Sequence, residues 1–238
     1  MPSQSVTGGT GPLQLRNTEV VCFWTGSVHG DQRPVIEDGS VAPTVVPAGS
    51  RVVGLRQVHG ADVVDVGNVA SAAEPSRMAL AAGDAAVASD LRTCPAILVA
   101  DCVPIAIGSP EGVRVAVHGG WRGLAAGIVA NAAAAARDRG ASRLVAGIGP
   151  CIGPCCYEFS EPDLARVASA LGEAVRAETR SGSPALDLRA AASSVLGAAG
   201  VEVDFEEPSC TACGTGWYSA RARADLARQA LYLWRADL

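Results

Sequence analysis

The sequence contains no lysine, little aromatic character and only three histidines in 238 residues. All 19 basic residues are arginine, and 24 acidic residues leave a formal net charge of −5. With no arginine-rich stripe, this charge offers no field for a polyanion, which argues against nucleic acid as a partner. Only 4% of residues are aromatic whereas 49% are hydrophobic. The core must therefore be built from small side chains in closely packed helices and strands.

The sequence also lacks a recognisable secretory signal and any apolar run long enough to span a membrane without charged or helix-breaking residues. We therefore expect a cytoplasmic protein that has no membrane partner. Its eight cysteines should then be reduced thiols, available for metal binding or catalysis rather than disulfides. No dimer seam or heptad is visible, so we expect a monomer.

Periodicity and turn residues predict one mixed α/β (α+β) domain over residues 19–238, preceded by a disordered tail over residues 1–18. Strands are expected at Val20–Trp24, Arg51–Val58, Asp62–Val66, Asp84–Ser89, Ala96–Ala100, Val113–His118, Arg143–Ile148 and Val201–Glu206. Helices are expected at Leu124–Arg137, Glu161–Glu178, Leu186–Ala199 and Ala220–Trp234, and loops at Val69–Met78 and Gly149–Pro154.

Two of the three histidines are each followed by glycine at the expected end of a strand, in Gln57-Val58-His59-Gly60 and Val117-His118-Gly119-Gly120. Such a histidine projects into a place where the backbone turns and a ligand can approach. Cys102 also follows an apolar run. Two imidazoles and one thiolate form a zinc ligand set with an open fourth position. Taken singly, each residue is better interpreted as structural, and the wide separation of the three in the sequence is no evidence that they meet.

The segment Gly119-Gly120-Trp121-Arg122-Gly123 leads into the helix expected at Leu124–Arg137. Amides at a helix N-terminus and one guanidinium make a plausible anion site, and the alternative is a tight turn with a solvated arginine. Asp101, beside Cys102, could orient a histidine or move a proton, or else cap backbone amides.

The remaining cysteines lie mainly in two loops. Cys151, Cys155 and Cys156 belong to one, and Cys210 and Cys213 form a C-x-x-C. A zinc site could be assembled from them, but they lack the paired spacing typical of one, so we interpret them as buried or loop thiols. Cys22, Cys94 and His29 lie in no recognisable motif, and His29 is interpreted as a surface or structural residue rather than a ligand.

Four segments together resemble the laccase-domain family, also called YfiH-like or polyphenol-oxidase-like, some members of which are described as peptidoglycan editing factors. They are Gln57–Gly60, Ala100–Ile105, Val117–Gly123 and Ile148–Glu158, followed by Cys210–Cys213 and Trp217–Ser219. The resemblance implies a single-domain layered α/β/β/α sandwich with mixed sheets, and a metal held by His59, Cys102 and His118. It also implies phosphorolysis of adenosine, inosine, guanosine and methylthioadenosine, and hydrolytic deamination of adenosine.

We therefore expect a purine nucleoside phosphorylase with adenosine deaminase activity, with zinc as cofactor, or copper, and with nucleosides and phosphate as its partners. Cys102 and Asp101 are the candidate catalytic residues, and Arg122, Gly120 and Gln57 the candidates for substrate or phosphate binding. One alternative is a copper-dependent polyphenol oxidase, although three histidines cannot build a cluster of several coppers. The other is a non-catalytic peptidoglycan-editing or metabolite-binding protein.

The sequence departs from the family pattern at both ends. The N-terminal Thr-Arg-x-Gly-Gly and Asn-Leu-Gly segments are reduced to fragments such as Phe23-Trp24-Thr25 and His29-Gly30-Asp31. The C-terminal aromatic-Ser-Tyr-Arg-Arg pattern is replaced by Trp217–Arg223. Substrate contacts from these two regions are therefore not carried over.

Overall fold

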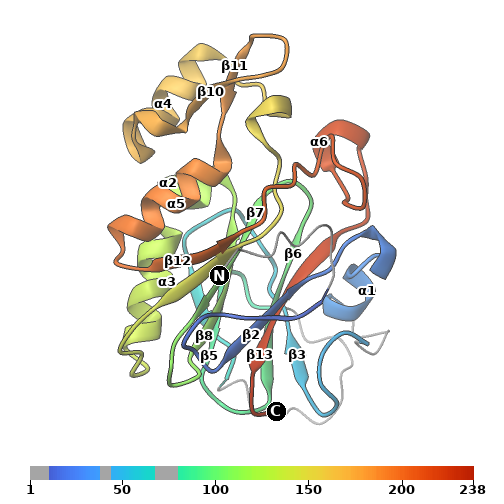
Figure 1. Cartoon of the computed structure of the whole chain (residues 1–238), viewed down its shortest axis with the longest axis vertical. Helices are drawn as coiled ribbons and strands as arrows, with labels where there is room; N and C mark the ends of the chain where they lie inside the picture. Colours follow the sequence, from blue (N-terminus) through green and yellow to red (C-terminus); the bar gives the residue numbers. More distant parts are fainter. Residues whose placement is uncertain (1–10, 38–43, 68–79) are drawn as a thin grey trace.

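The computed structural model describes residues 11–37, 44–67 and 80–238 (Figure 1). The loop expected at Val69–Met78 and the first ten residues lie outside this description. Within the expected tail, Leu13–Gln14 forms strand β1, which pairs with β2, and Leu15 is fully buried. The folded part of the chain therefore begins before residue 19.

Two mixed sheets form the centre of the molecule. The six-stranded sheet has the order β12-β9-β7-β8-β5-β4, with parallel pairing only at its two edges. Its strands are β12 (Glu202–Glu206), β9 (Val145–Ile148), β7 (Val103–Gly108), β8 (Arg114–Gly119), β5 (Ala85–Ala88) and β4 (Val63–Asp65). The five-stranded sheet has the order β1-β2-β13-β6-β3, from β1, β2 (Val20–Trp24), β13 (Gln229–Arg235), β6 (Thr93–Val99) and β3 (Arg51–Val53).

Helices cover the outer faces of these sheets, and an apolar layer fills the space between them. On the outer side of the six-stranded sheet lie α2 (Trp121–Ala125), α3 (Ile128–Arg137) and α5 (Leu188–Ala198) (Figure 1). Between the sheets pack residues such as Leu15, Trp24 and Ile97. Short α1 (Arg33–Ile36) packs on the far side of the five-stranded sheet through Ile36. The predicted single-domain layered α/β/β/α fold is confirmed.

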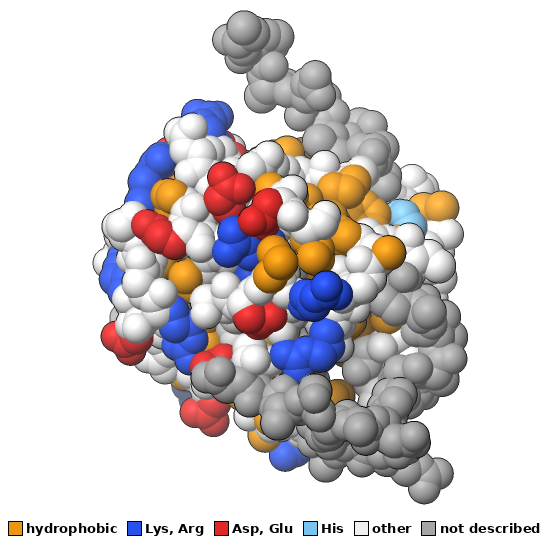
Figure 2. Space-filling model, turned by 90° about the horizontal axis from the view of Figure 1, so that it is seen from below, with side chains coloured by type: hydrophobic (Ala, Val, Ile, Leu, Met, Phe, Trp, Pro, Cys, Tyr) orange, Lys and Arg blue, Asp and Glu red, His pale blue; other side chains and the backbone are white. Residues whose placement is uncertain are grey.

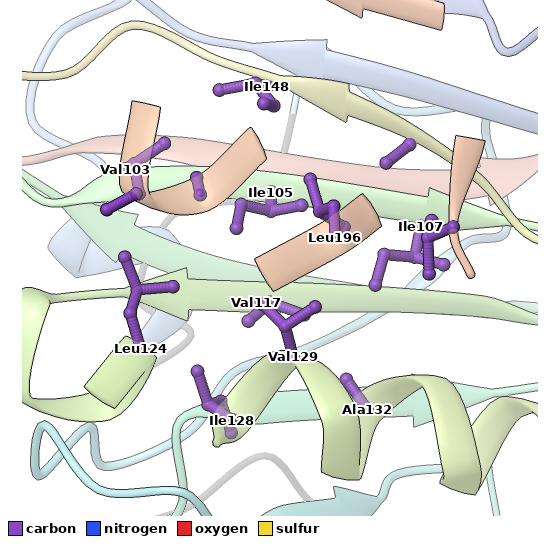
Figure 3. Packing of buried hydrophobic residues seen from close by; sticks show 14 of the residues in the cluster. Val103, Ile105, Ile107, Val117, Leu124, Ile128, Val129, Ala132, Ile148 and Leu196 are labelled. Atoms are coloured by element: carbon purple, nitrogen blue, oxygen red, sulfur yellow. The ribbon is translucent and has the colours of Figure 1, made fainter. Parts of the chain in front are cut away.

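The core under the helices shows why the sequence is rich in small apolar residues. Side chains of the central strands, such as Ile105 and Val117, meet helix residues that include Val129, Ala132 and Leu196 (Figure 3). Alanine on the inner face of α3 lets the helix backbone approach the sheet closely. Close packing of this kind replaces the bulk that aromatic residues supply in other cores.

Three predicted helices have different bounds in the structure. The helix expected at Glu161–Glu178 ends early, because α4 (Glu161–Leu171) stops at Gly172, where φ is 95°. The chain then forms β10 (Arg176–Glu178), which pairs with β11 (Pro184–Leu186). The helix expected at Leu186–Ala199 begins later, because α5 starts only after its N-cap Asp187. The helix expected at Leu124–Arg137 is divided into α2 and α3 at Gly127, where φ is 91°.

The C-terminal helix predicted at Ala220–Trp234 is wrong. Only α6 (Ala220–Arg223) is helical, and β13 follows it as a central strand. Leu231 and Leu233 face the layer between the sheets, whereas Tyr232 and Trp234 face the opposite core. Because both faces are apolar, the alternation that normally marks a strand is hidden in the sequence. Strand β7 was missed for the same reason, since all six of its residues are buried.

The surface carries mixed charge. On the face seen in Figure 2, arginines and acidic side chains are interspersed with apolar ones, and the described residues form no continuous basic stripe there. In the part of the chain that the structure describes, no helix combines the length and apolarity needed to cross a membrane.

Candidate metal centre

The three predicted metal ligands come from separate parts of the fold and meet in space. His59 lies in the turn between β3 and β4, Cys102 between β6 and β7, and His118 within β8. One donor atom from each lies within 4.8 Å of the other two. The Cys102 Sγ is 4.0 Å from His59 Nε2, and the two imidazole rings are 4.8 Å apart, nearly perpendicular at 78°. The expectation that both histidines end strands holds only approximately for His118 and not for His59.

A single buried carboxylate, Asp84, positions both histidines. Its Oδ1 accepts hydrogen bonds from His118 Nδ1 at 2.8 Å and from the His59 amide at 2.9 Å. Its Oδ2 accepts from the amides of Gly60 at 2.7 Å and Val58 at 3.2 Å. The hydrogen bonds from these three amides hold the turn in which His59 adopts a φ of 61°. The bond to Nδ1 leaves Nε2 of His118 available as a ligand atom.

The electrostatics of the site favour a thiolate at Cys102. Burial by itself raises the pKa of this thiol, but hydrogen bonds from His118 and His59 outweigh burial and lower it to about 6. Burial also lowers the pKa of His118, whereas its bonds to Asp84 and Cys102 raise it to about 9. Asp84 itself is desolvated, which raises its pKa, yet the bond from His118 and the backbone amides hold that pKa below its ordinary value. The anionic sulfur is the form that binds metal.

Asp101 shapes the turn that presents Cys102. Its φ is 88°, and its carboxylate accepts hydrogen bonds from the Thr211 hydroxyl at 2.6 Å and the Arg221 amide at 2.7 Å. The Asp101 carbonyl accepts from the Ile152 amide. Neither histidine is among the hydrogen-bond partners of this carboxylate. The arrangement fits the alternative in which Asp101 caps backbone groups, and it is Asp84 that orients a histidine.

Two glycines let the helix that begins at Trp121 approach the ligands. A Cβ on Gly120 would lie 3.0 Å from the His59 ring and 3.4 Å from Cys102 Sγ. A Cβ on Gly123 would lie 2.7 Å from the Gly60 carbonyl oxygen. This segment therefore needs glycine at both positions for contact with the turn of the first ligand.

We expect Gly123→Ala to lower the free energy of unfolding by about 1–3 kcal/mol, because the added methyl overpacks against a backbone oxygen. Urea unfolding measures this directly. Gly197→Ala in α5 is the matched control: nothing lies within 4 Å of its Cβ, so higher helix propensity should stabilise the protein. Equal changes in the free energy of unfolding for the two substitutions would contradict the conclusion that Gly123 is needed for close approach to Gly60.

A cleft of about 790 Å³ opens onto the three ligands. Its apolar lining includes Leu55, Leu80, Leu98 and Val99, and its charged lining comprises Arg33, Glu37, Arg56 and Arg228. Arg33 pairs with Asp31 at 2.6 Å, and Arg228 donates to carbonyls at the preceding turn. The Arg56 guanidinium has no hydrogen-bond or ion-pair partner among the described residues. The cleft thus joins apolar surface, free positive charge and the ligand trio.

The other predicted binding residues occupy different positions. Gln57 lines the cleft, but its amide is used in two hydrogen bonds with the backbone of Leu98, both of 2.8 Å. Gly120 adjoins the trio, as described above. Arg122 is exposed, stacks over the Trp121 ring at 4.5 Å, and is not part of the cleft lining.

Several residues of the site escaped sequence reasoning. Asp84 was predicted only as the start of a strand, and its separation from His59 and His118 by 25 and 34 residues gave no signal that it contacts them. Arg33 and Glu37 come from the N-terminal segment that departs from the family pattern, and Arg228 from the mispredicted C-terminal helix. These regions still contribute to the cleft, even though their motifs are not the usual ones.

Comparison with known proteins agrees with this geometry. The family model described as "Multi-copper polyphenol oxidoreductase laccase" matches residues 24–236. This chain belongs to that laccase-domain family. Among its relatives is a protein of Streptomyces coelicolor named purine nucleoside phosphorylase, 38% identical over 78% of this chain and 75% of that protein. A second relative with that name, from Streptomyces griseus, is 36% identical over 78% of this chain and 74% of that protein.

Two solved structures share the fold. YlmD from Geobacillus stearothermophilus superimposes with a TM-score of 0.72 at 24% identity, covering 98% of this chain and 99% of that one. A Neisseria meningitidis protein gives a TM-score of 0.75 at 21% identity, with 95% and 99% coverage. The layered sandwich is therefore retained across sequences that differ at most positions.

Proposed function

We propose that this member of the laccase-domain family is a metal-dependent purine nucleoside phosphorylase, acting on adenosine, inosine, guanosine and methylthioadenosine, with additional adenosine deaminase activity. The observation that carries the proposal is the convergence of His59, Cys102 and His118 in the lining of a cleft large enough for a nucleoside. The names of the two Streptomyces relatives supply the reaction class.

The donor set fits zinc. Bond lengths of about 2.3 Å to sulfur and 2.0–2.1 Å to nitrogen in a tetrahedral site place sulfur about 3.6 Å from each nitrogen. The 4.0 Å separation between Cys102 Sγ and His59 Nε2 is close to this value. A small movement of His59, which is the most exposed of the three, would complete the geometry. When bound, zinc would supply Lewis-acid catalysis and lower the pKa of a water ligand to about 7, as hydrolytic deamination requires.

The chain itself supplies substrate binding. The apolar side chains of the cleft form a surface for the purine, and the arginines suit an anion. We assign phosphate to Arg56, because its guanidinium has no hydrogen-bond or ion-pair partner among the residues that the structure describes, and the predicted role of Arg122 becomes the competing assignment. Arg56 would hold phosphate toward the sugar and offset the negative charge of the phosphate as the glycosidic bond breaks. Asp84 keeps His118 in one orientation throughout.

The family description also favours a second function, copper-dependent oxidation of phenols. A two-nitrogen, one-sulfur set suits a single copper ion as well as zinc. A cluster of several coppers needs many histidines, and this chain has three. The third, His29, accepts a hydrogen bond from the Gly26 amide and packs edge-on against Phe23. Nucleoside chemistry is therefore the better supported proposal.

Product analysis tests the proposal. Purified protein of known metal content is incubated with adenosine, with and without inorganic phosphate. Adenine that forms only with phosphate identifies phosphorolysis, and inosine with ammonia identifies deamination. Neither product from folded, zinc-loaded protein would overturn the proposal and favour the peptidoglycan-editing or metabolite-binding alternative. Oxygen consumption with a phenol by copper-loaded protein would favour the oxidase.

We expect Arg56→Gln to raise the KM for phosphate by about 10-fold or more, since a hydrogen bond to a charged group contributes about 1.5–3 kcal/mol. Deamination uses no phosphate and should keep its rate. Arg122→Gln is the comparison, because it removes the competing candidate. A raised phosphate KM in Arg122→Gln alone would contradict the assignment to Arg56.

A further inference from the structure

A second group of metal-binding side chains lies outside the trio. Cys155, Cys156, Cys210 and Cys213 come from two loops far apart in the sequence, and their four sulfur atoms all lie within 4.8 Å of one another. The spacing of these cysteines in the sequence argued against such a site, because one pair is adjacent rather than separated by two residues. The fold nevertheless brings the two pairs together.

We propose that these four cysteines form a structural zinc site, distinct from the His59, Cys102 and His118 centre. In a tetrahedral site with zinc–sulfur bonds of about 2.3 Å, the sulfur atoms lie about 3.8 Å apart. The Cys155 and Cys213 sulfurs are 3.7 Å apart. Four sulfur ligands in a tetrahedral arrangement are typical of zinc and leave no position open for a substrate.

The backbone around the cluster is arranged for sulfur ligands. The Gly153 amide donates to Cys210 Sγ at 3.2 Å. The C-x-x-C turn is closed by a hydrogen bond from the Gly214 amide to the Cys210 carbonyl. A Cβ on Gly153 would lie 3.3 Å from Cys155 Sγ and 3.6 Å from Cys210 Sγ, so glycine leaves room for the sulfurs. Amide donors of this kind stabilise thiolates.

Positive charge accompanies the cluster. Zinc with four thiolates carries a net charge of about −2, which a partly buried site must offset. The Arg180 guanidinium lies 3.4 Å from Cys213 Sγ. The Arg223 guanidinium donates to the carbonyls of Thr211, Ala212 and Trp217, within and just after the C-x-x-C. Arg180 therefore places cationic charge beside a sulfur atom, whereas Arg223, which also pairs with Asp225, holds the backbone of the C-x-x-C turn.

The site would join the loop after β9 to the loop after β12. These loops already touch, since the Thr211 amide donates to the Cys151 carbonyl. Thr211 follows Cys210 directly and donates its hydroxyl to Asp101, the neighbour of Cys102. Zinc at the four cysteines would therefore hold the turn that presents a ligand of the trio, without touching substrate.

The experiment isolates this site by removing the other. Cys102→Ala protein is reduced, incubated with zinc chloride, dialysed and assayed for metal. We expect one retained zinc equivalent, which is lost when Cys155→Ser and Cys213→Ser are added and kept when Cys94→Ala is added instead. Cobalt in place of zinc should show the intense sulfur charge-transfer bands of a tetrathiolate. Because the trio is already disabled, the result is independent of the proposed nucleoside chemistry.

Alkylation of the cysteines tests the site even if the protein that carries Cys155→Ser and Cys213→Ser in addition to Cys102→Ala does not fold. With zinc, Cys155, Cys156, Cys210 and Cys213 in Cys102→Ala protein should be protected from iodoacetamide, as read from peptide masses, and a chelator should expose them together. The proposed site would be overturned if the reduced protein retained no zinc. It would also be overturned if zinc did not change the reaction of the four cysteines with iodoacetamide. Iron retained in preference to zinc would overturn the choice of metal.

Discussion

Replacing Cys102 with alanine is expected to abolish metal-dependent turnover of adenosine, with a loss of more than about 100-fold. The substitution removes the only sulfur of the trio and leaves two imidazoles, which hold zinc much more weakly than a set containing a thiolate. Total zinc should fall by one equivalent, while the four-cysteine site keeps its own. The measurements are zinc content by mass spectrometry and initial rates with and without phosphate.

Cys94→Ala is the matched control for this prediction. Cys94 is fully buried in β6 and belongs to neither of the two groups of potential metal ligands found among the described residues. Cys94→Ala should lower the free energy of unfolding slightly and leave the turnover of adenosine unchanged. Wild-type turnover in Cys102→Ala would show that the trio is not the active site, even if the protein proves to be a phosphorylase.

The substitution Asp84→Asn is expected to lower zinc affinity at the trio by about 10–100-fold, as loss of a carboxylate that orients a histidine ligand usually does. Asparagine has one acceptor oxygen, whereas Asp84 accepts from three backbone amides and from His118. Its amide group would therefore face hydrogen-bond donors at the turn of His59. Competition with a chromophoric chelator measures the affinity.

Asp90→Asn provides the comparison. Asp90 also accepts from backbone amides, those of Arg92 and Thr93, but it does not line the cleft. It should affect the free energy of unfolding without changing zinc affinity. If Asp84→Asn lowered stability as Asp90→Asn does and kept the affinity of the wild type, its role would be structural only.

The three trio residues could be found from the sequence because each sits in a short segment with its own signal: a histidine before glycine, or a cysteine after an apolar run. Their meeting could not be derived, since 43 residues separate Cys102 from His59 and spacing over such a length does not imply contact. Asp84 carried no such signal, because one acidic residue at a strand start has many possible partners.

The candidate phosphate-binding arginines also divide into one that a local pattern predicts and others that only the fold places. Arg122 was chosen because it follows glycines at a helix start, a local pattern. Arg56 and Arg228 have no such pattern, and they line one cleft only because β13 runs through the centre of the five-stranded sheet. The apolar C-terminal segment was taken for a helix, since burial on both faces removes the alternation that distinguishes a strand.

The sequence by itself determined the composition of the core, the mixed α/β class, the family and the identity of the trio, because these depend on residue type and short motifs. The tertiary structure alone decided which carboxylate orients His118, which arginines face the cleft, and that two distant cysteine pairs meet. These are contacts between segments far apart in the chain. Each depends on the register and order of strands, and local residue patterns do not contain that information.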